Sequence, residues 1–103
     1  MNGCLFCKII KGEIPTKFVY QDREIVVFAD IKPKARVHLL VVPTLHIKSF
    51  LDLSVKNFSL LTKMVKVIQR LIREQKIGGS YHLVINGGAR LEVSHLHWHL
   101  LGD

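Results

Sequence analysis

Three histidines alternate with apolar residues near the end of the chain, in the stretch His-Leu-His-Trp-His-Leu-Leu at 95–101. Successive side chains of an extended strand point to opposite faces, so His95, His97 and His99 are predicted to share one face, with neighbours roughly 6.6 Å apart along the backbone. A buried row of titratable rings is costly to desolvate unless each ring has a partner or a task. A neutral imidazole can attack phosphorus and hold the transferred group covalently. The row therefore predicts a functional site.

A pair of cysteines near the start of the chain, Cys4 and Cys7, is separated by two residues. This spacing is too short to staple a fold, so it argues for a reducing compartment and for metal or redox use. The same gap occurs in zinc knuckles, but a tetrahedral site needs two further ligands from elsewhere. The alternative is two reduced cysteines that pack as small apolar groups.

Length and composition predict one domain, residues 1–103, in which 49% apolar residues can form a single small core. A core of this size would gain from dimerisation. No apolar run reaches the length of a membrane span, and the first residues lack the basic, apolar and small-residue order of a signal peptide. We therefore expect a cytoplasmic protein without a membrane role.

The chain carries 15 Lys and Arg against 8 Asp and Glu, a net charge of +7 that suits a phosphate ligand, a polyanion or simple solubility. The basic residues are spread out, and those in the segment 63–73 recur at the three- and four-residue intervals of a solvated helix face. A nucleic-acid surface would need a basic patch with interleaved aromatics, and aromatics make up only 8% of the chain. This argues against nucleic-acid binding as the main role.

The first half of the chain has the pattern of a short antiparallel meander. A helical or turn segment is expected over residues 4–11. Lys32-Pro33-Lys34 should break the pairing between neighbouring strands, and Pro43 should end the last strand of the group. Alternation and β-branched residues predict three strands, at 17–21, 24–30 and 36–42.

The period changes to that of an amphipathic helix over residues 54–76. Gly78-Gly79 should stop this helix. Two further strands, 80–86 and 93–101, are expected to flank a turn at Gly87-Gly88 and to complete a five-stranded sheet, which gives an α+β fold. The apolar stripe that should lie on the sheet is formed by Leu61, Met64, Val65, Ile68, Leu71 and Ile72.

The histidine pattern, with an apolar residue inside each gap and two after the last histidine, resembles the signature of the histidine triad (HIT) family of nucleotide hydrolases and transferases. The similarity extends over nearly the whole chain and is closest to the short branch of histidine triad nucleotide-binding proteins (HINT). Besides the triad it rests, in chain order, on Leu5-Phe6-Cys7-Lys8-Ile9-Ile10, Glu13-Ile14-Pro15, Phe28-Ala29-Asp30-Ile31, His38-Leu39-Leu40-Val41-Val42-Pro43 and Asn86.

This resemblance implies a HIT-like fold in which two protomers join their five-stranded sheets into one of ten strands, as a homodimer. It also implies hydrolysis of purine nucleoside 5′-phosphoramidates, in which AMP is joined to an amine, through a covalent nucleotidyl-histidine intermediate. His97 would be the nucleophile, His99 would bind phosphate oxygens, and His38 would be a fourth imidazole near the site. No catalytic metal would be required.

The resemblance assigns the remaining nucleotide contacts as well. Asp30 would bind the ribose hydroxyls and Asn86 the phosphate or leaving group, although both residues also suit turns. Such sites distinguish bases only loosely, because an apolar pocket offers few polar groups. His82 has no counterpart in the motif and is expected to be structural or exposed. The purine pocket would be formed by Leu5, Phe6, Ile9, Ile14, Phe28 and Ile31.

A structural zinc ion is implied too, held by Cys4, Cys7, His46 and His95. This closed site would pin the N-terminal segment to the sheet. A DNA-binding finger is a poor alternative, because the whole segment 8–45 separates Cys7 from His46. A catalytic metal held by the three triad histidines is a more serious rival, but the outer two lie too far apart on a straight strand.

Three positions before the triad depart from the family pattern. Gly-Gln-Ser or Gly-Gln-Glu is frequent there, and this chain has Arg90-Leu91-Glu92. Leu91 cannot hydrogen-bond as Gln would, and Glu92 in the nucleotide site is either a proton donor for the leaving group or a tolerated variant. Two alternatives to the phosphoramidate hydrolase therefore stay open: a dinucleoside polyphosphate hydrolase, and a nucleotide-binding module with little turnover.

Overall fold

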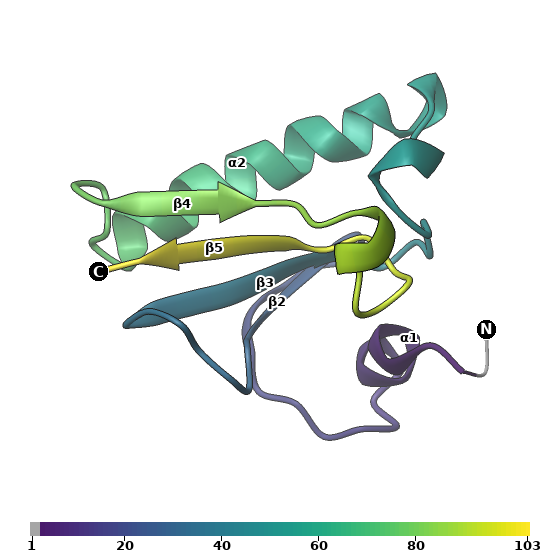
Figure 1. The fold of residues 1–103 in the computed structure, drawn as a ribbon, viewed down its shortest axis with the longest axis horizontal. Coiled ribbons are helices and arrows are strands. Elements are labelled where there is room, and N and C mark those ends of the chain that lie inside the picture. The colour runs from purple at the N-terminus through teal and green to yellow at the C-terminus, as the bar shows by residue number, and fades with distance from the viewer. Residues whose placement is uncertain (1–2) are drawn as a thin grey trace.

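A five-stranded antiparallel sheet organises the computed structural model of the chain, which describes residues 3–103 (Figure 1). None of the helices in this described part combines the length and apolarity needed to cross a membrane. The α+β prediction is confirmed. The helices are α1 (Leu5–Ile10) and α2 (Phe58–Glu74), and the strands are β1 (Phe18–Gln21), β2 (Ile25–Ala29), β3 (Val37–Pro43), β4 (Tyr81–Val84) and β5 (Trp98–Gly102).

The spatial order of the strands is β1-β2-β3-β5-β4, so the last strand of the chain lies in the interior of the sheet. β5 pairs with β3 on one side and with β4 on the other, both antiparallel. In this register His99 lies opposite Leu40 of β3 and opposite Val84 of β4. His38 lies two pairs further along, opposite Leu101, and so on the same face of the sheet as His99. Two histidines from distant parts of the sequence therefore meet on neighbouring strands.

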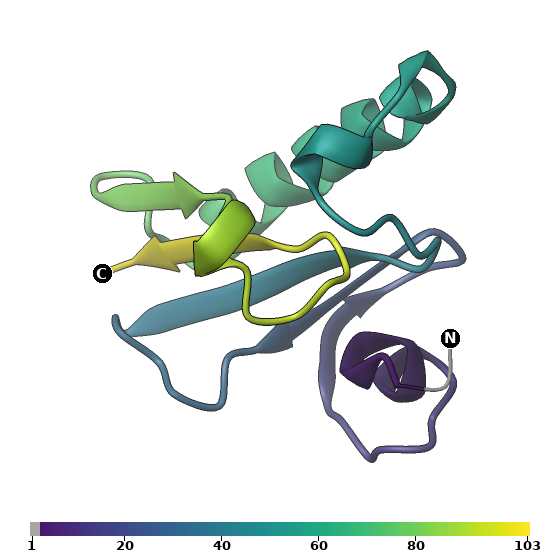
Figure 2. The same ribbon diagram turned by 45° about the vertical axis from the view of Figure 1, so that its right-hand side comes forward.

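The two faces of the sheet are covered by different helices, as the two views show (Figures 1 and 2). Because side chains alternate along a strand, β2 and β3 are buried on both faces. On one face the long helix α2 packs over the strands, and on the other the short helix α1 does. The strand residues on the α2 side are Ile25, Val27, Val37, Leu39, Val41, Trp98 and Leu100, and those on the α1 side are Val26, Phe28, Leu40 and Val42.

The long helix is shorter than predicted at both ends. Its start follows a turn in which the Asn57 Oδ1 accepts the Ser54 N–H at 3.0 Å, so residues 54–57 cap the helix without belonging to it. Its end comes at Glu74, and Lys76 takes the left-handed conformation (φ 58°), two residues before the glycines expected to stop the helix. Val65 of the predicted stripe is 43% exposed.

The prediction of a strand over 93–101 is wrong for its first half. Only residues from Trp98 onward pair in β5, so His95 and His97 lie in the loop before it. A tertiary hydrogen bond accounts for this loop. The Leu96 N–H donates to the Ile47 carbonyl at 2.6 Å, so it does not pair with a neighbouring strand. The expected tight turn at Gly87-Gly88 is also wrong, since residues 85–97 form a long connection with one 3-10 turn.

Candidate active site

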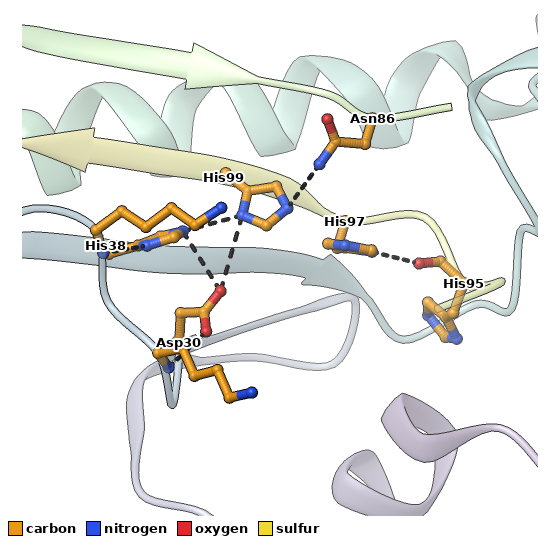
Figure 3. Close-up of polar contacts among 8 residues, drawn as sticks. Asp30, His38, Asn86, His95, His97 and His99 are labelled. Carbon is orange, nitrogen blue, oxygen red and sulfur yellow. Dashed lines mark hydrogen bonds and ion pairs between the residues drawn. The ribbon is translucent and has the colours of Figure 1, made fainter. Parts of the chain in front are cut away.

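The ring of His97 has one nitrogen in a hydrogen bond and the other without a hydrogen-bond partner in the described structure. Its Nδ1 lies 2.8 Å from the backbone carbonyl of His95 (Figure 3), and a carbonyl only accepts, so the Nδ1 carries the proton. The Nε2 then keeps its lone pair. The side chain is buried, and the edge of Phe6 packs against it with ring centroids 4.9 Å apart. This geometry suits a nucleophile.

His38 and His99 form a directed chain of hydrogen bonds beside His97. The Lys34 backbone N–H donates to the His38 Nδ1 at 3.1 Å, so the proton of that ring is on Nε2. The His38 Nε2 lies 3.0 Å from the His99 Nδ1 and 3.4 Å from the Asp30 Oδ2 (Figure 3). The His99 Nδ1 therefore accepts, and its Nε2–H is available as a donor.

The charge state of His99 follows from its surroundings. Burial lowers the pKa of the His99 ring, and the neighbouring His97 and His38 lower it further, whereas Asp30 and Glu92 act in the opposite direction. The ring is thus neutral near pH 7. Its Nε2 lies 3.4 Å from the Asn86 Nδ2, and both nitrogens can donate to the same negatively charged oxygen.

Two adjoining cavities meet at these residues. The first, of about 170 Å³, lies under α1 and is mostly apolar, with His97 and His99 in its wall. The second, of about 370 Å³, is polar and includes His38, Asn86 and two lysines. Four residues line both cavities: Asp30, Ile31, Glu92 and His99. A ligand with an apolar ring at one end and an anionic group at the other would fit across this boundary.

Most residues expected to form a purine pocket lie on the apolar cavity, and one does not. Ile14 is partly buried against the hydrophobic cluster under α1 and is not part of the cavity wall. Ile31 lines the cavity although 92% of its side chain is exposed. His82 is exposed on β4, as expected. The predicted residues that line the apolar cavity are Leu5, Phe6, Ile9, Phe28 and Ile31.

Sequence reasoning missed the part played by Lys32 and Lys34. The segment was interpreted only as a strand breaker, yet the Lys32 N–H donates to the Asp30 Oδ1 at 2.9 Å and the Lys34 N–H fixes the His38 ring. Asp30 is thus both a turn residue and a residue of the site. The signal was present in part, because Asp before a Pro-containing turn commonly accepts the N–H two residues on.

The second cluster joins the cysteines to two histidines. The His46 Nδ1 lies 3.3 Å from the Cys7 Sγ, the His95 Nδ1 lies 3.4 Å from the Cys4 Sγ and 3.5 Å from the Cys7 Sγ, and the two Nδ1 atoms are 3.0 Å apart. Around a tetrahedral zinc ion these edges would be about 3.6 Å for S to N and about 3.3 Å for N to N. The four residues present therefore fit zinc within a few tenths of an ångström.

The environment of this cluster also suits a metal ion. The His95 Nε2–H donates to the Pro43 carbonyl at 2.8 Å, which leaves the Nδ1 lone pair facing the cysteines. Burial lowers the pKa of the His95 ring and keeps it neutral. Burial also raises the pKa of the Cys7 thiol, and the adjacent Cys4 raises it further, so thiolates here need a positive charge close by.

The triad histidines do not converge on one metal ion. His95 faces the cysteines, whereas His99 groups with Asp30 and His38, and His97 belongs to neither group within residues 3–103. The second group is a poor metal site, because the His38 Nε2 that faces it carries a proton. The rival interpretation of a catalytic metal held by all three triad histidines is therefore not supported by this geometry.

Comparison with known proteins gives consistent matches. The family described as "Scavenger mRNA decapping enzyme C-term binding" matches residues 3–103. An uncharacterised HIT-like protein of Buchnera aphidicola subsp. Baizongia pistaciae is 46% identical, over 95% of this chain and 90% of that protein. The purine nucleoside phosphoramidase of Escherichia coli strain K12 is 38% identical, over 95% of this chain and 85% of that protein.

Solved structures agree with the sequence matches. A HIT family hydrolase from Clostridium thermocellum superimposes with a TM-score of 0.95 and 36% identity, covering 100% of this chain and 92% of that chain. This match covers the strands that carry His38 and His99 and the loop that carries His97. The chain belongs to the histidine triad (HIT) family, and its relatives include hydrolases.

Proposed function

We propose that this protein is a nucleotide hydrolase or transferase that splits purine nucleoside 5′-phosphoramidates through a nucleotidyl-His97 intermediate. The observation that carries the proposal is the hydrogen bond from the His97 Nδ1 to the His95 carbonyl, because it leaves an unprotonated Nε2 in the wall of the apolar cavity. The 38% identical relative named purine nucleoside phosphoramidase supports the choice of substrate.

In the first step the His97 Nε2 attacks the α-phosphorus and the bond from phosphorus to the amine nitrogen breaks. The leaving amine departs with a proton, for which Glu92 is our candidate donor because it lines both cavities. His99 and Asn86 donate to the phosphate oxygens, where negative charge builds up. The apolar cavity holds the base, and Asp30 accepts from the ribose hydroxyls.

In the second step water attacks phosphorus, the bond to the His97 Nε2 breaks, and the nucleoside monophosphate leaves. The water loses a proton, which returns to Glu92 and restores the proton that Glu92 gave to the amine in the first step. His97 returns to its starting form without a net change of proton, because its Nδ1–H stays on the His95 carbonyl throughout. A covalent intermediate of this kind divides one difficult displacement into two easier ones, and no divalent metal takes part in either.

We further propose structural zinc at Cys4, Cys7, His46 and His95. Zinc would supply a closed tetrahedral centre that connects α1 to the sheet and has no open position for substrate. The fit of the donor distances supports this assignment. A cytoplasmic location is proposed with it, since the two cysteines are free and thiolate ligands persist in a reducing compartment.

A homodimer is the proposed assembly, in which two copies of β4 join the sheets into one of ten strands. β4 is an edge strand with one pairing partner in the described chain, and its Tyr81, Leu83 and Val84 are each more than a third exposed. An exposed apolar edge is a template for pairing with another chain. The family match over residues 3–103 supports a single domain, 1–103, as the repeating unit.

A dinucleoside polyphosphate hydrolase is the second candidate. The polar cavity favours it, because Lys32 and Lys34 border a space of about 370 Å³ beside His99 that could take further phosphates. This reaction would use the same nucleophile and would change only the leaving group. A nucleotide-binding module with little turnover stays as the outcome expected if Leu91, where relatives often have Gln, prevents catalysis.

The experiment that tests the proposal measures AMP release from adenosine 5′-phosphoramidate and from a diadenosine polyphosphate, with intact-protein mass spectrometry of samples quenched during turnover. Turnover of the phosphoramidate, with a covalent nucleotidyl adduct that is missing from His97→Ala, supports the proposal. Faster turnover of the polyphosphate would favour the second candidate. Tight binding without product or adduct would favour the binding module.

A further inference from the structure

His95 connects the cysteine cluster to the nucleophile His97. Its ring is fully buried and faces Cys4, Cys7 and His46, while its backbone carbonyl accepts the His97 Nδ1–H. One residue therefore connects the cysteine cluster to the nitrogen that fixes the tautomer of the nucleophile. The ring is held on its other side too, by the Pro43 carbonyl.

The connecting backbone leaves little freedom between the cysteine cluster and His97. The His95 N–H donates to the Val93 carbonyl at 2.8 Å, and the Leu96 N–H donates to the Ile47 carbonyl at 2.6 Å. Ile47 directly follows His46, the fourth member of the cysteine cluster. A change in the position of His46 or His95 is therefore transmitted to the carbonyl that holds His97.

A second route runs through helix α1. Phe6 lies between the two cysteines in the sequence, and its ring contacts both His95, at 6.0 Å between centroids, and His97, at 4.9 Å. The Cys4 Sγ accepts the Cys7 N–H at 3.3 Å, so the cysteines also define the first turn of this helix. Binding of Cys4 and Cys7 to one metal ion would therefore hold the Phe6 ring in contact with the His97 ring.

We infer that Cys4, Cys7, His46 and His95, with zinc bound, form a positioning device for His97 and do more than stabilise the fold. The inference rests on the proposed function, since it concerns the same nucleophile. Cys4 and His46 line neither nucleotide cavity, although the hollow of about 540 Å³ that they border shares Leu5, Glu92 and Val93 with the apolar cavity. Their effect on His97 passes through neighbouring residues, of which His95 holds the Nδ1–H of His97 and Phe6 contacts its ring.

The direct test observes the His97 ring by two-bond ¹⁵N–¹H NMR at one fixed pH, in protein loaded with Zn²⁺ and after removal of Zn²⁺ by a chelator. We expect one tautomer with the proton on Nδ1 when zinc is bound, and a mixture of tautomers without it. The exposed His82 ring is the internal control and should not change. An unchanged His97 spectrum, or global unfolding on removal of zinc, would overturn the inference.

Variants separate positioning from stabilisation. His46→Ala should lower kcat by about 10- to 100-fold and leave KM within about threefold, because the substrate cavities are untouched. His46→Cys restores a four-ligand set of a type that zinc accepts and should recover most of kcat. Equal kcat in His46→Ala and wild type, or a loss confined to KM, would contradict the inference.

The NMR readout needs no substrate, so failure of the inference is distinguishable from failure of the proposed function. If wild-type protein forms no adduct on His97 but the His97 spectrum changes with zinc, the positioning role is supported and the proposed reaction is contradicted. If the adduct forms and the His97 spectrum does not change with zinc, the proposed reaction is supported and the positioning role is contradicted.

Discussion

On the α2 side of the sheet, alternate residues of β2, β3 and β5 pack with the long helix into a continuous apolar core, whereas on the α1 side the intervening positions carry the histidines and the cavities. The same strands thus build both regions. None of the residues in the buried cluster on the α2 side is titratable. The α1 side buries His38 and His97 and gives each a hydrogen-bond partner.

This difference explains why a chain of 103 residues can maintain a polar site. Buried polar groups cost free energy even when they are paired, so another region must supply the stability. Helix α2 covers one face with 17 residues, while α1 covers part of the other with only 6 and leaves space for a ligand. Substitutions on the two sides should accordingly affect different measurements.

The largest effect is expected from His97→Ala on the α1 side. Removal of the nucleophile should lower kcat by at least ~10³-fold, because the covalent step has no substitute group. The melting temperature should fall less than in a core truncation such as Met64→Ala, because the ring packs against Phe6 beside the cavity and not in the α2-side core. His82→Ala, at an exposed position, is the matched control. Residual turnover above a few per cent would mean that another group attacks phosphorus.

The largest effect on stability is expected from Met64→Ala on the α2 side. The Met64 side chain is fully buried in the α2-side core, and truncation of such a residue costs about 2–5 kcal/mol through lost burial and the cavity left behind. Urea denaturation measures this change, and Lys66→Ala on the exposed side of the same helix should be near neutral. A reduced kcat per folded molecule would show that the two sides are not independent.

An intermediate effect is expected from Asp30→Asn. The amide oxygen keeps the hydrogen bond from the Lys32 N–H, so the turn survives, but the charge facing the ribose is lost. A hydrogen bond to a charged group contributes about 1.5–3 kcal/mol, which corresponds to a rise in KM of about 10-fold or more. The rise should shrink with a 2′,3′-dideoxy substrate. An equal rise for both substrates would argue against contact with the ribose, and Glu74→Gln on α2 serves as the control for charge.

A smaller effect on the free energy of unfolding is expected from a decrease in pH. The pKa of His99 is below its ordinary value of about 6.5 in the folded state, with burial as the main cause. Above pH 6.5 the group is neutral in both states; as the pH falls from there to the lowered folded pKa, only the unfolded state binds the proton. The free energy of unfolding should therefore decrease over this window. His99→Gln should flatten the decrease, and an unchanged slope would contradict the assignment.

The smallest effect is expected from Val65→Ala on α2. Val65 belongs to the apolar stripe of the sequence, but it is 43% exposed in the structure. The change in unfolding free energy should stay within about 0.5 kcal/mol, as for other exposed positions. A loss close to that of Met64→Ala would show that this side of α2 is covered in solution, for example by a second copy of the chain.

The local pattern of the sequence was sufficient to predict most of the helices and strands. The first three strands begin and end within one residue of their predicted limits, because alternation and β-branched residues act over a few positions. Helix α2 was predicted from its period, although its ends depend on the Ser54–Asn57 turn and on Lys76. The family resemblance gave the overall arrangement of the sheet in the protomer, which periodicity alone does not determine.

The geometry of the site depended on contacts that no local pattern contains. His95 and His97 leave the strand because Leu96 bonds to Ile47, far away in the sequence. As a result His95 joins the cysteines and His99 joins Asp30 and His38, instead of the three histidines forming one row. The tautomer of His38 depends on the Lys34 N–H, which a sequence shows only as part of a turn.

The most direct test of the proposed mechanism is to locate the covalent bond after reaction with adenosine 5′-phosphoramidate, by tandem mass spectrometry of the trapped peptide and ³¹P NMR of the denatured protein. We expect a single nucleotidyl group on the His97 Nε2, the nitrogen that the His95 carbonyl leaves free. A nucleotidyl group on His97 Nδ1, on His99 or on His38 would contradict it.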